Sequence, residues 1–353
     1  MKADRKRRRD HSATLSDVAR HAGVSLATAS RVLNGSDRQV GEALRTKVES
    51  AAQELRYTPH GPAQAVARGT SRFVALVIGD IADPYFASIA AGVTQEADRR
   101  GLTVAVAATG GDAERETAVV DALRSQRPRA LLLARSRTLR SKNDTATREL
   151  LAEIARTGAG VAYLGGETSD PADEPLCMLR LGGRTAGGEL GQSLVESGYR
   201  DFVVLAGPKN HATAVERTKG FSTALRRAGL PAPPRVHGPL TRAGARDAMN
   251  QVLEDGHRPE CVFAVTDMMA VGAMAALRDH GLHPGRDVAV AGFDDIELLQ
   301  DVQPSLTTVA LPLTEIGETL LRVALDGEDA DVIRGQVRLR ESTPTRNGTP
   351  TRG

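Results

Sequence analysis

A short segment near the start of the chain carries side chains that can read the edges of DNA bases. Arg31 can donate two parallel hydrogen bonds to guanine, a contact worth about 1 to 3 kcal/mol of discrimination. Leu26 and Ala27 can touch thymine methyl groups or fill space. The polar groups around them suit phosphate oxygens, which position a helix without reading sequence, and they are Ser16, Thr28, Ser30 and Asn34.

The spacing of apolar residues predicts the helices that hold these side chains. Residues 15–22 carry apolar side chains at intervals of three and four, which is typical of an amphipathic helix, with Ser16 as its N-cap and Gly23 at its end. After a three-residue turn, a second helix presents the polar face, and a third helix ending near Leu55 closes a small core. The alternative is a pair of helices that only packs against a larger domain.

Charge divides the chain in the same place. The chain as a whole carries +2, but residues 1–72 carry +7 and the remainder carries −5. A local basic excess is typical of a nucleic-acid-binding segment, although a basic tail alone is usually only solvated. We expect residues 1–13 to be a disordered basic arm.

These motifs carry a family resemblance. The run TLSDVARHAGVSLATASRVLNG, followed by Tyr57-x-Pro59 and the segment 63–66 (AQAV), resembles the headpiece of the lactose-repressor/galactose-repressor (LacI/GalR) family of bacterial regulators. The resemblance implies that Leu26, Ala27 and Arg31 read the major groove. It also implies that a hinge enters the minor groove at the centre of a palindromic operator, through Ala63, Gln64 and Val66.

Two hinge positions depart from that family. Val66 stands where a leucine wedge is usual, and His60 stands where asparagine is usual. A shorter, β-branched wedge unstacks a base step less deeply, so weaker DNA kinking is expected. The alternative is a plain linker.

The rest of the chain alternates short β-rich runs with amphipathic segments, which predicts an α/β protein with parallel sheets. The predicted strands are too many for one compact sheet and favour two doubly wound lobes. The resemblance implies the same two-lobed architecture, like that of a periplasmic sugar-binding protein. The expected divisions are a helix-turn-helix domain at 14–58, a hinge at 59–71, a core at 72–343 (first lobe 72–163 and 307–328, second lobe 164–303 and 329–343) and a disordered tail at 344–353.

Residues near the carboxyl ends of the predicted strands could bind a ligand, because open parallel sheets bind ligands there. A guanidinium, a carboxylate and aromatic rings suit a polar, ring-shaped molecule. The candidates are Tyr85, Phe86, Arg217, Thr266 and Asp294. The alternatives are purely structural roles: a helix cap for Asp294, a surface ion pair for Arg217 and a core position for Phe86.

The resemblance implies that these positions contact an effector, a sugar or a related metabolite. The sequence lacks polar pairs common in the family, since it has Gly165-Gly166 and Gly182-Gly183 at those places. A smaller or more apolar ligand, or a degenerate site, is therefore an alternative. No metal-ligand spacing and no dinucleotide fingerprint is visible, and no cofactor is expected.

The combined prediction is a homodimeric transcription regulator, a repressor that binds double-stranded operator DNA under control of a small molecule. No apolar run is long enough to span a membrane and no export signal is visible, so a cytoplasmic location is expected. Cys177 and Cys261 are expected to be ordinary reduced thiols. The alternatives are a solute-binding protein and a sugar- or nucleotide-processing enzyme, although no catalytic pattern is recognisable.

Overall fold

The computed structural model describes residues 13–34, 40–57, 71–135, 142–167, 176–327 and 330–346. Contacts divide the chain into an N-terminal unit, Met1–Ser71, and a C-terminal unit, Arg72–Gly353. The described helices of the N-terminal unit are α1 (Leu15–Ala22), α2 (Leu26–Asn34) and α3 (Glu42–Glu54). The expected basic arm at 1–13, apart from Ala13, lies outside the described residues, and so do the hinge residues His60, Ala63, Gln64 and Val66.

A small apolar core holds the N-terminal unit together. Val18, Ala29 and Val48 are fully buried and contribute one side chain from each helix. The N-cap of the first helix lies two residues earlier than expected, because it is Thr14 and not Ser16. The Thr14 hydroxyl accepts a hydrogen bond from the Asp17 backbone, and the Asp17 carboxylate accepts one from the Thr14 backbone at 3.0 Å. This capping box satisfies two backbone donors at once, which a serine inside the first turn cannot do.

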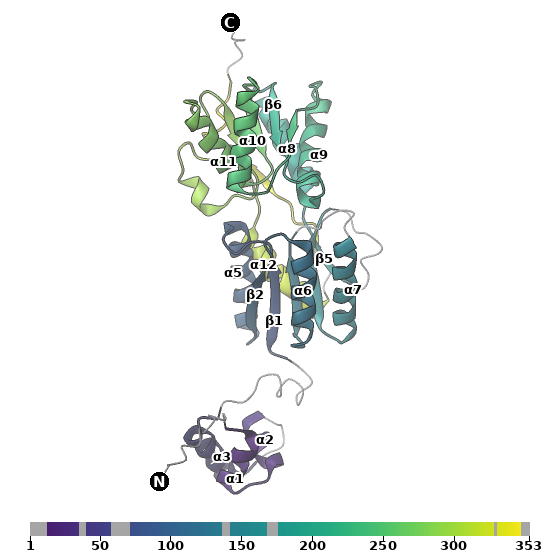
Figure 1. The fold of residues 1–353 in the computed structure, drawn as a ribbon, viewed down its shortest axis with the longest axis vertical. Helices are drawn as coiled ribbons and strands as arrows, with labels where there is room; N and C mark the ends of the chain where they lie inside the picture. The colour runs from purple at the N-terminus through teal and green to yellow at the C-terminus, as the bar shows by residue number, and fades with distance from the viewer. Residues whose placement is uncertain are drawn as a thin grey trace, which may run out of the picture. The chain divides into compact units, whose positions relative to one another are not determined.

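The first lobe of the C-terminal unit is a parallel sheet covered on both faces (Figure 1). Its described strands, in the spatial order β2-β1-β3-β4-β5, are β1 (Phe73–Ile78), β2 (Thr103–Ala108), β3 (Ala130–Ala134), β4 (Gly160–Gly165) and β5 (Cys177–Arg180). Side chains alternate between the faces: Val74 and Leu76 enter one apolar cluster, and Ala75 and Val77 enter another. The helices of this lobe are α5 (Pro84–Arg99), α6 (Ala113–Arg124), α7 (Lys142–Arg156) and α12 (Leu313–Asp326).

Helices α5 and α12 pack so closely that their glycines are required. A Cβ on Gly92 would lie 1.9 Å from the Thr314 carbonyl oxygen, and one on Gly317 would lie 2.1 Å from the Ile89 carbonyl oxygen. Helix α12 therefore returns from the end of the chain to cover the first sheet.

The second lobe repeats the same construction. Its described sheet has the order β7-β6-β8-β9, formed by β6 (Phe202–Leu205), β7 (Arg235–Val236), β8 (Cys261–Ala264) and β9 (Ala289–Ala291). The remaining elements are α8 (Gly183–Glu196), α9 (Ala212–Arg227), α10 (Arg242–Glu254), α11 (Asp267–Asp279), the short 3-10 helix η2 (Glu297–Gln300) and the antiparallel pair β10 (Thr308–Ala310) and β11 (Gln336–Arg338). The mixed α/β class with parallel sheets is confirmed.

Two predicted boundaries differ from the structure. The second lobe was expected from residue 164, but β5 pairs in parallel with β4, so the first sheet continues to Arg180. The tail was expected from residue 344, but residues 344–346 are held in place: the Tyr199 hydroxyl donates to the Pro344 carbonyl at 2.6 Å, and the Arg346 backbone donates to the Ser197 carbonyl.

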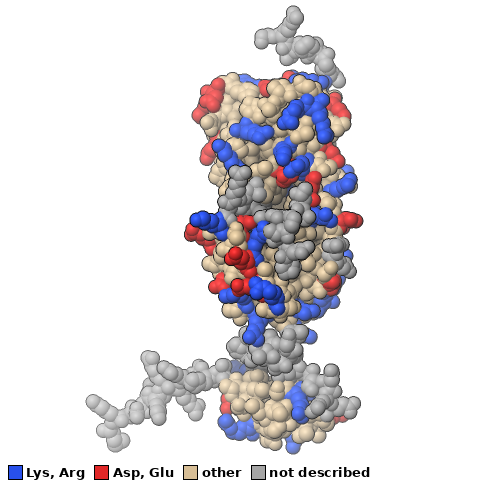
Figure 2. All heavy atoms as spheres, turned by 90° about the vertical axis from the view of Figure 1, so that its right-hand side faces the viewer, with Lys and Arg blue, Asp and Glu red and all other residues tan. Residues whose placement is uncertain are grey.

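Charged side chains of both signs are interspersed on the face of the C-terminal unit that Figure 2 presents. The net −5 of residues 73–353 is therefore not gathered into a single patch on that face. None of the described helices combines the length and the apolar character that a membrane crossing needs. Cys177 and Cys261 are both free thiols.

Candidate functional site

The exposed face of α2 carries the three residues predicted to read bases. Leu26 is 51% exposed, and Ala27 and Arg31 are also exposed. Covering a half-exposed leucine with a partner removes apolar surface from water, which is favourable in free energy. This face of α2 is therefore suited to contact with a partner. Ser25 fixes the start of the helix by accepting a hydrogen bond from the Thr28 backbone at 3.1 Å.

The predicted phosphate contacts surround that face unevenly. Ser16 is exposed, whereas Thr28 and Ser30 are half-buried. The Thr28 hydroxyl already pairs with the Ser25 hydroxyl at 2.8 Å. The side chain of Asn34 lies outside the described residues.

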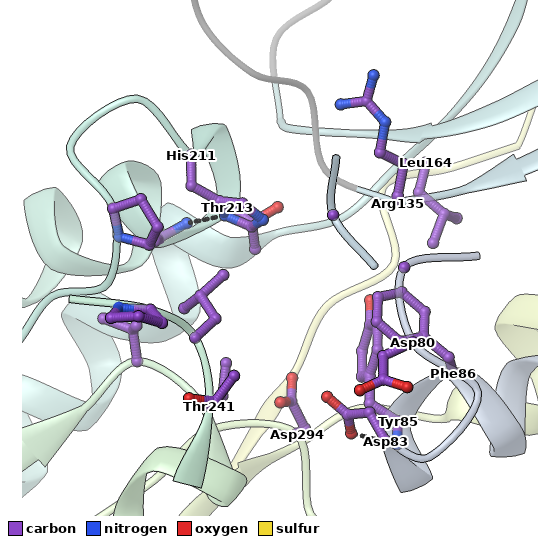
Figure 3. Close-up of a pocket in the computed structure, with 18 of the residues that line it drawn as sticks. Asp80, Asp83, Tyr85, Phe86, Arg135, Leu164, His211, Thr213, Thr241 and Asp294 are labelled. Atoms are coloured by element: carbon purple, nitrogen blue, oxygen red, sulfur yellow. Dashed lines mark hydrogen bonds between the residues drawn. The ribbon is translucent and has the colours of Figure 1, made fainter. Parts of the chain in front are cut away.

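A cavity of about 360 Å³ in the C-terminal unit contains all five predicted effector residues (Figure 3). Its volume falls in the range of small-molecule sites. The five residues come from four places along the chain, each on the segment that follows a strand. The five are Tyr85 and Phe86 in the first turn of α5, Arg217 in the second turn of α9, Thr266 before α11 and Asp294 after β9.

Arg217 is a buried anchor and not a surface ion pair. Its side chain is 4% exposed, and its Nη2 atom donates to Asp294 Oδ1 at 2.8 Å. Its Nη1 atom donates to the Val265 carbonyl at 2.7 Å, and its guanidinium carbon lies 3.8 Å from the centre of the Phe293 ring. These three contacts fix the guanidinium at the cavity wall.

Asp294 has an unusual backbone as well as a buried side chain. Its φ is +126°, a conformation that residues other than glycine rarely adopt and that often marks a functional site. Its backbone donates to the Val309 carbonyl at 2.9 Å, which ties the turn after β9 to β10. Asp294 therefore does not cap a helix, and burial raises the pKa of its carboxyl against the opposing charge of Arg217.

Thr266 and Asp267 have separate roles. The Thr266 hydroxyl caps α11 by accepting from the Met269 backbone at 3.2 Å, so a structural role coexists with its place at the cavity. Asp267 is fully buried and accepts from the Thr308 hydroxyl at 2.6 Å and from the Ile296 backbone at 2.9 Å. Burial raises the pKa of Asp267 to about 6. Asp267 holds the segment after β9 in place.

Aromatic side chains form one wall. The rings of Tyr85 and Phe86 meet edge to face with centroids 5.0 Å apart. Phe86 also lies over Gly79, where an added Cβ would sit 2.8 Å from the ring. Phe86 thus belongs both to the packing of the loop and to the cavity lining.

Several lining residues were not among the predicted effector contacts. Asp80 and Asp83 come from the β1–α5 loop, and His211 is the N-cap of α9. Burial near Arg217 lowers the pKa of His211 to about 4, so its ring is neutral at pH 7. Arg135, which follows β3, and Glu116 also line the cavity. They form a buried, two-bond ion pair, and in Figure 3 the Arg135 side chain extends away from the other labelled groups.

The two glycine pairs, Gly165-Gly166 and Gly182-Gly183, differ in the space available for a side chain. A Cβ on Gly165 would lie 2.1 Å from the Met178 sulfur, so that position is crowded. A Cβ on Gly183 would lie 3.6 Å from Arg217 Cγ, an ordinary contact. A side chain would therefore fit beside Arg217 at this position. Among the described residues, no group of three His, Cys, Asp or Glu side chains is arranged to hold a metal ion.

Comparisons with known proteins agree with this geometry. Residues 14–60 match the family described as bacterial regulatory proteins, lacI family, and residues 192–346 match a periplasmic binding protein-like domain. The ribose operon repressor of Escherichia coli (strain K12) is 33% identical over 315 residues, covering 89% of this chain and 92% of that protein. The transcriptional repressor CytR of the same strain is 30% identical, with 91% of each chain covered.

A solved structure resembles the fold along most of its length. The lac repressor dimer bound to operator and the anti-inducer ONPF has a TM-score of 0.76 and 28% identity, covering 95% of this chain and all of that one. A family of regulators, not of enzymes, is thereby identified, and the expectation of a non-enzymatic protein is confirmed. The chain belongs to the lacI family of bacterial regulatory proteins.

Proposed function

We propose that this chain is a cytoplasmic homodimeric repressor that binds a palindromic operator. In each copy, Leu26, Ala27 and Arg31 contact base edges in the major groove, while Ser16, Thr28 and Ser30 contact phosphates. The observation that carries the proposal is the exposure on α2, the second helix of a helix-turn-helix, of a leucine and of an arginine that has no partner among the described residues. Two copies related by a twofold axis would match two half-sites.

The cavity supplies the control. We propose that it binds a small-molecule effector, a sugar or a related metabolite, through Arg217, Asp294, Thr266, Tyr85 and Phe86. The name of the ribose operon repressor supports a sugar among the candidates. The cavity lies in the C-terminal unit, which begins at Arg72, directly after the last residue of the N-terminal unit. The polypeptide chain therefore connects the cavity-bearing unit to the DNA-binding unit. A coupling of about 1 to 3 kcal/mol changes operator affinity about 5- to 150-fold.

Selection of bound fragments from randomised DNA duplexes tests this function. The full-length protein is expected to enrich a palindrome, and binding to it is expected to change in the presence of one of a panel of sugars and nucleosides. The direction of that change identifies an inducer or a corepressor. If the protein enriches no sequence under any condition, the proposal is contradicted and a solute-binding protein is favoured.

A further inference from the structure

The charges that line the cavity do not balance. Four carboxyl groups line it but only two guanidinium groups do, and both guanidinium groups are already paired within the described residues. Arg217 pairs with Asp294, and Arg135 pairs with Glu116. His211 adds no positive charge, because burial keeps its ring neutral. Two carboxylates, Asp80 and Asp83, are therefore left without a cationic partner among the lining residues.

Each of these two carboxylates has one oxygen committed to its own loop. Asp80 Oδ1 accepts from the Ala82 backbone at 2.9 Å, and Asp83 Oδ1 accepts from the Tyr85 backbone at 3.0 Å. The second oxygen of each has no hydrogen bond to a described residue. Carboxylates fixed in this way remain acceptors with an unused oxygen.

Asp294 adds a buried acceptor that faces the same space. The residue is 2% exposed, and the hydrogen bond from Arg217 reaches only its Oδ1 atom. Its Oδ2 atom has no hydrogen bond within the described part of the chain. In Figure 3 the carboxylates of Asp80, Asp83 and Asp294 lie near one another at one end of the cavity. An oxygen that lines the cavity and has no hydrogen bond to the protein can accept one from a ligand.

Among the described residues, no group of three His, Cys, Asp or Glu side chains is arranged to hold a metal ion, and the occupant considered for this end is an organic compound. It must also fit the apolar wall formed by Tyr85, Phe86, Leu164 and Leu240. A ring compound satisfies the wall, and an ammonium group, which has three donors and no acceptor, satisfies the carboxylates. A phosphate or carboxylate at this end would face the like charge of Asp80, which is exposed, and of Asp83, which is half-buried.

We propose that the cavity selects an amine-bearing, cationic ring compound of sugar or nucleoside size, with its ammonium group among Asp80, Asp83 and Asp294, and rejects phosphorylated analogues. This inference rests on the proposed function, because it names the chemistry of the effector. The negative charge of the lining contrasts with the mixed charges on the outer face in Figure 2.

Isothermal titration of the full-length protein at pH 7 with two matched series tests the proposal. One series is D-glucosamine, D-glucose and D-glucose 6-phosphate, and the other is 5′-amino-5′-deoxyadenosine, adenosine and adenosine 5′-phosphate. In at least one series the amine is expected to bind on the order of 10-fold more tightly than the neutral compound, because charge-assisted hydrogen bonds are the stronger ones. The phosphate is expected to bind most weakly.

Substitutions identify the carboxylates responsible. Asp83→Asn keeps the N-cap of α5 and Asp80→Asn keeps the loop hydrogen bond, since asparagine supplies the same acceptor. Both variants are expected to lose the preference for the amine while circular dichroism stays unchanged. Asp98→Asn, which removes the same charge from an exposed position late in α5, is expected to retain it.

Equal or tighter binding of a neutral or phosphorylated compound overturns the proposal, and so does the failure of both amines to bind. Retention of the amine preference in both Asp80→Asn and Asp83→Asn overturns the assignment of the carboxylates. None of these results touches the proposed function, because selection of a palindromic operator is measured on DNA. Loss of operator selection would instead overturn that function and leave the ligand preference measurable.

Discussion

The N-terminal and C-terminal units use arginine in opposite ways. Arg31 is exposed on α2 and has no described partner, whereas Arg217 is buried against Asp294, Val265 and Phe293. An exposed guanidinium contributes little to folding and is free for a macromolecular partner. A buried one is part of the fold and offers a ligand a fixed wall. Substitution of Arg31 should therefore change DNA binding without changing the stability of the N-terminal unit. Substitution of Arg217 should change both ligand binding and the stability of the C-terminal unit.

The largest expected effect is at Arg217. Arg217→Ala leaves the buried Asp294 carboxylate without its partner, which costs about 3 to 5 kcal/mol in comparable buried pairs. We expect urea denaturation to show the transition of the C-terminal unit at lower urea, with the N-terminal unit unchanged.

A double substitution distinguishes a stranded charge from lost packing. Arg217→Met combined with Asp294→Leu removes both charges and retains apolar volume, so much of the lost stability should return. A double variant as unstable as Arg217→Ala would show that the φ of Asp294 or the Phe293 contact dominates instead.

Arg31 should give the reverse result. Arg31→Ala is expected to cost about 1 to 3 kcal/mol of specific operator binding and to relax the base preference at one position. The free energy of unfolding should change by less than about 0.5 kcal/mol, as is usual for an exposed residue. Binding to the selected operator and to random DNA, measured by fluorescence anisotropy, provides the comparison.

Arg45→Ala is the matched control, since Arg45 is exposed on α3 and carries the same charge. It should lower affinity for both DNAs by a similar small factor. If Arg31→Ala also weakens both DNAs equally, Arg31 contacts phosphate and the base-reading assignment is wrong.

The same contrast explains what the sequence could predict. The helices of the N-terminal unit could be predicted from local spacing. In the first helix, an amphipathic stripe over Leu15–Ala22 is followed directly by Gly23, which adopts the left-handed conformation in the structure. The cap was misplaced because Ser16 and Thr14 are both good caps, and only the reciprocal bond with Asp17 decides between them. That bond is a property of backbone geometry.

The cavity was only partly predictable. Arg217 and Asp294 were found because residues near the carboxyl ends of parallel strands meet at one edge of a sheet. Asp80 and His211 were missed because a polar residue in a loop gives no signal of the direction it faces. The extent of the first sheet was harder to predict, because the apolar run of β5 is only three residues long before Arg180 and its pairing with β4 is a tertiary contact.

The assignment of the first helix cap is open to a direct test. Thr14→Ala is expected to destabilise the N-terminal unit by about 1 kcal/mol, within the range of 0.5 to 2 for lost caps. Ser16→Ala, one residue inside the helix, should change stability by less than about 0.5 kcal/mol. Thermal denaturation followed by circular dichroism measures both. A larger loss in Ser16→Ala would restore serine as the cap.

The smallest expected effect is a pH dependence in the C-terminal unit. His211 Nδ1 accepts from the Ala214 backbone at 3.4 Å, and only the neutral ring can accept. Because folding lowers the pKa of His211 to about 4, its contribution to stability is present above pH 6.5, the ordinary value, and is lost as the pH falls toward 4. We expect a loss of up to about 1 kcal/mol, the value of a helix cap, because the hydrogen bond is long.

His211→Asn isolates this contribution, since asparagine is a good N-cap that does not titrate. Urea denaturation at pH 7 and pH 5 should show a smaller decrease in the variant than in the original protein. An equal decrease would mean that the carboxylates govern the acid response. Carboxyl groups whose pKa is raised by folding act in the opposite sense. Asp267 is an example: its contribution to stability is present below its ordinary pKa and is lost as the pH rises through about 6. Asp267, at the start of α11, is present in both proteins, so its contribution cancels in their difference, which reports only the histidine at the start of α9.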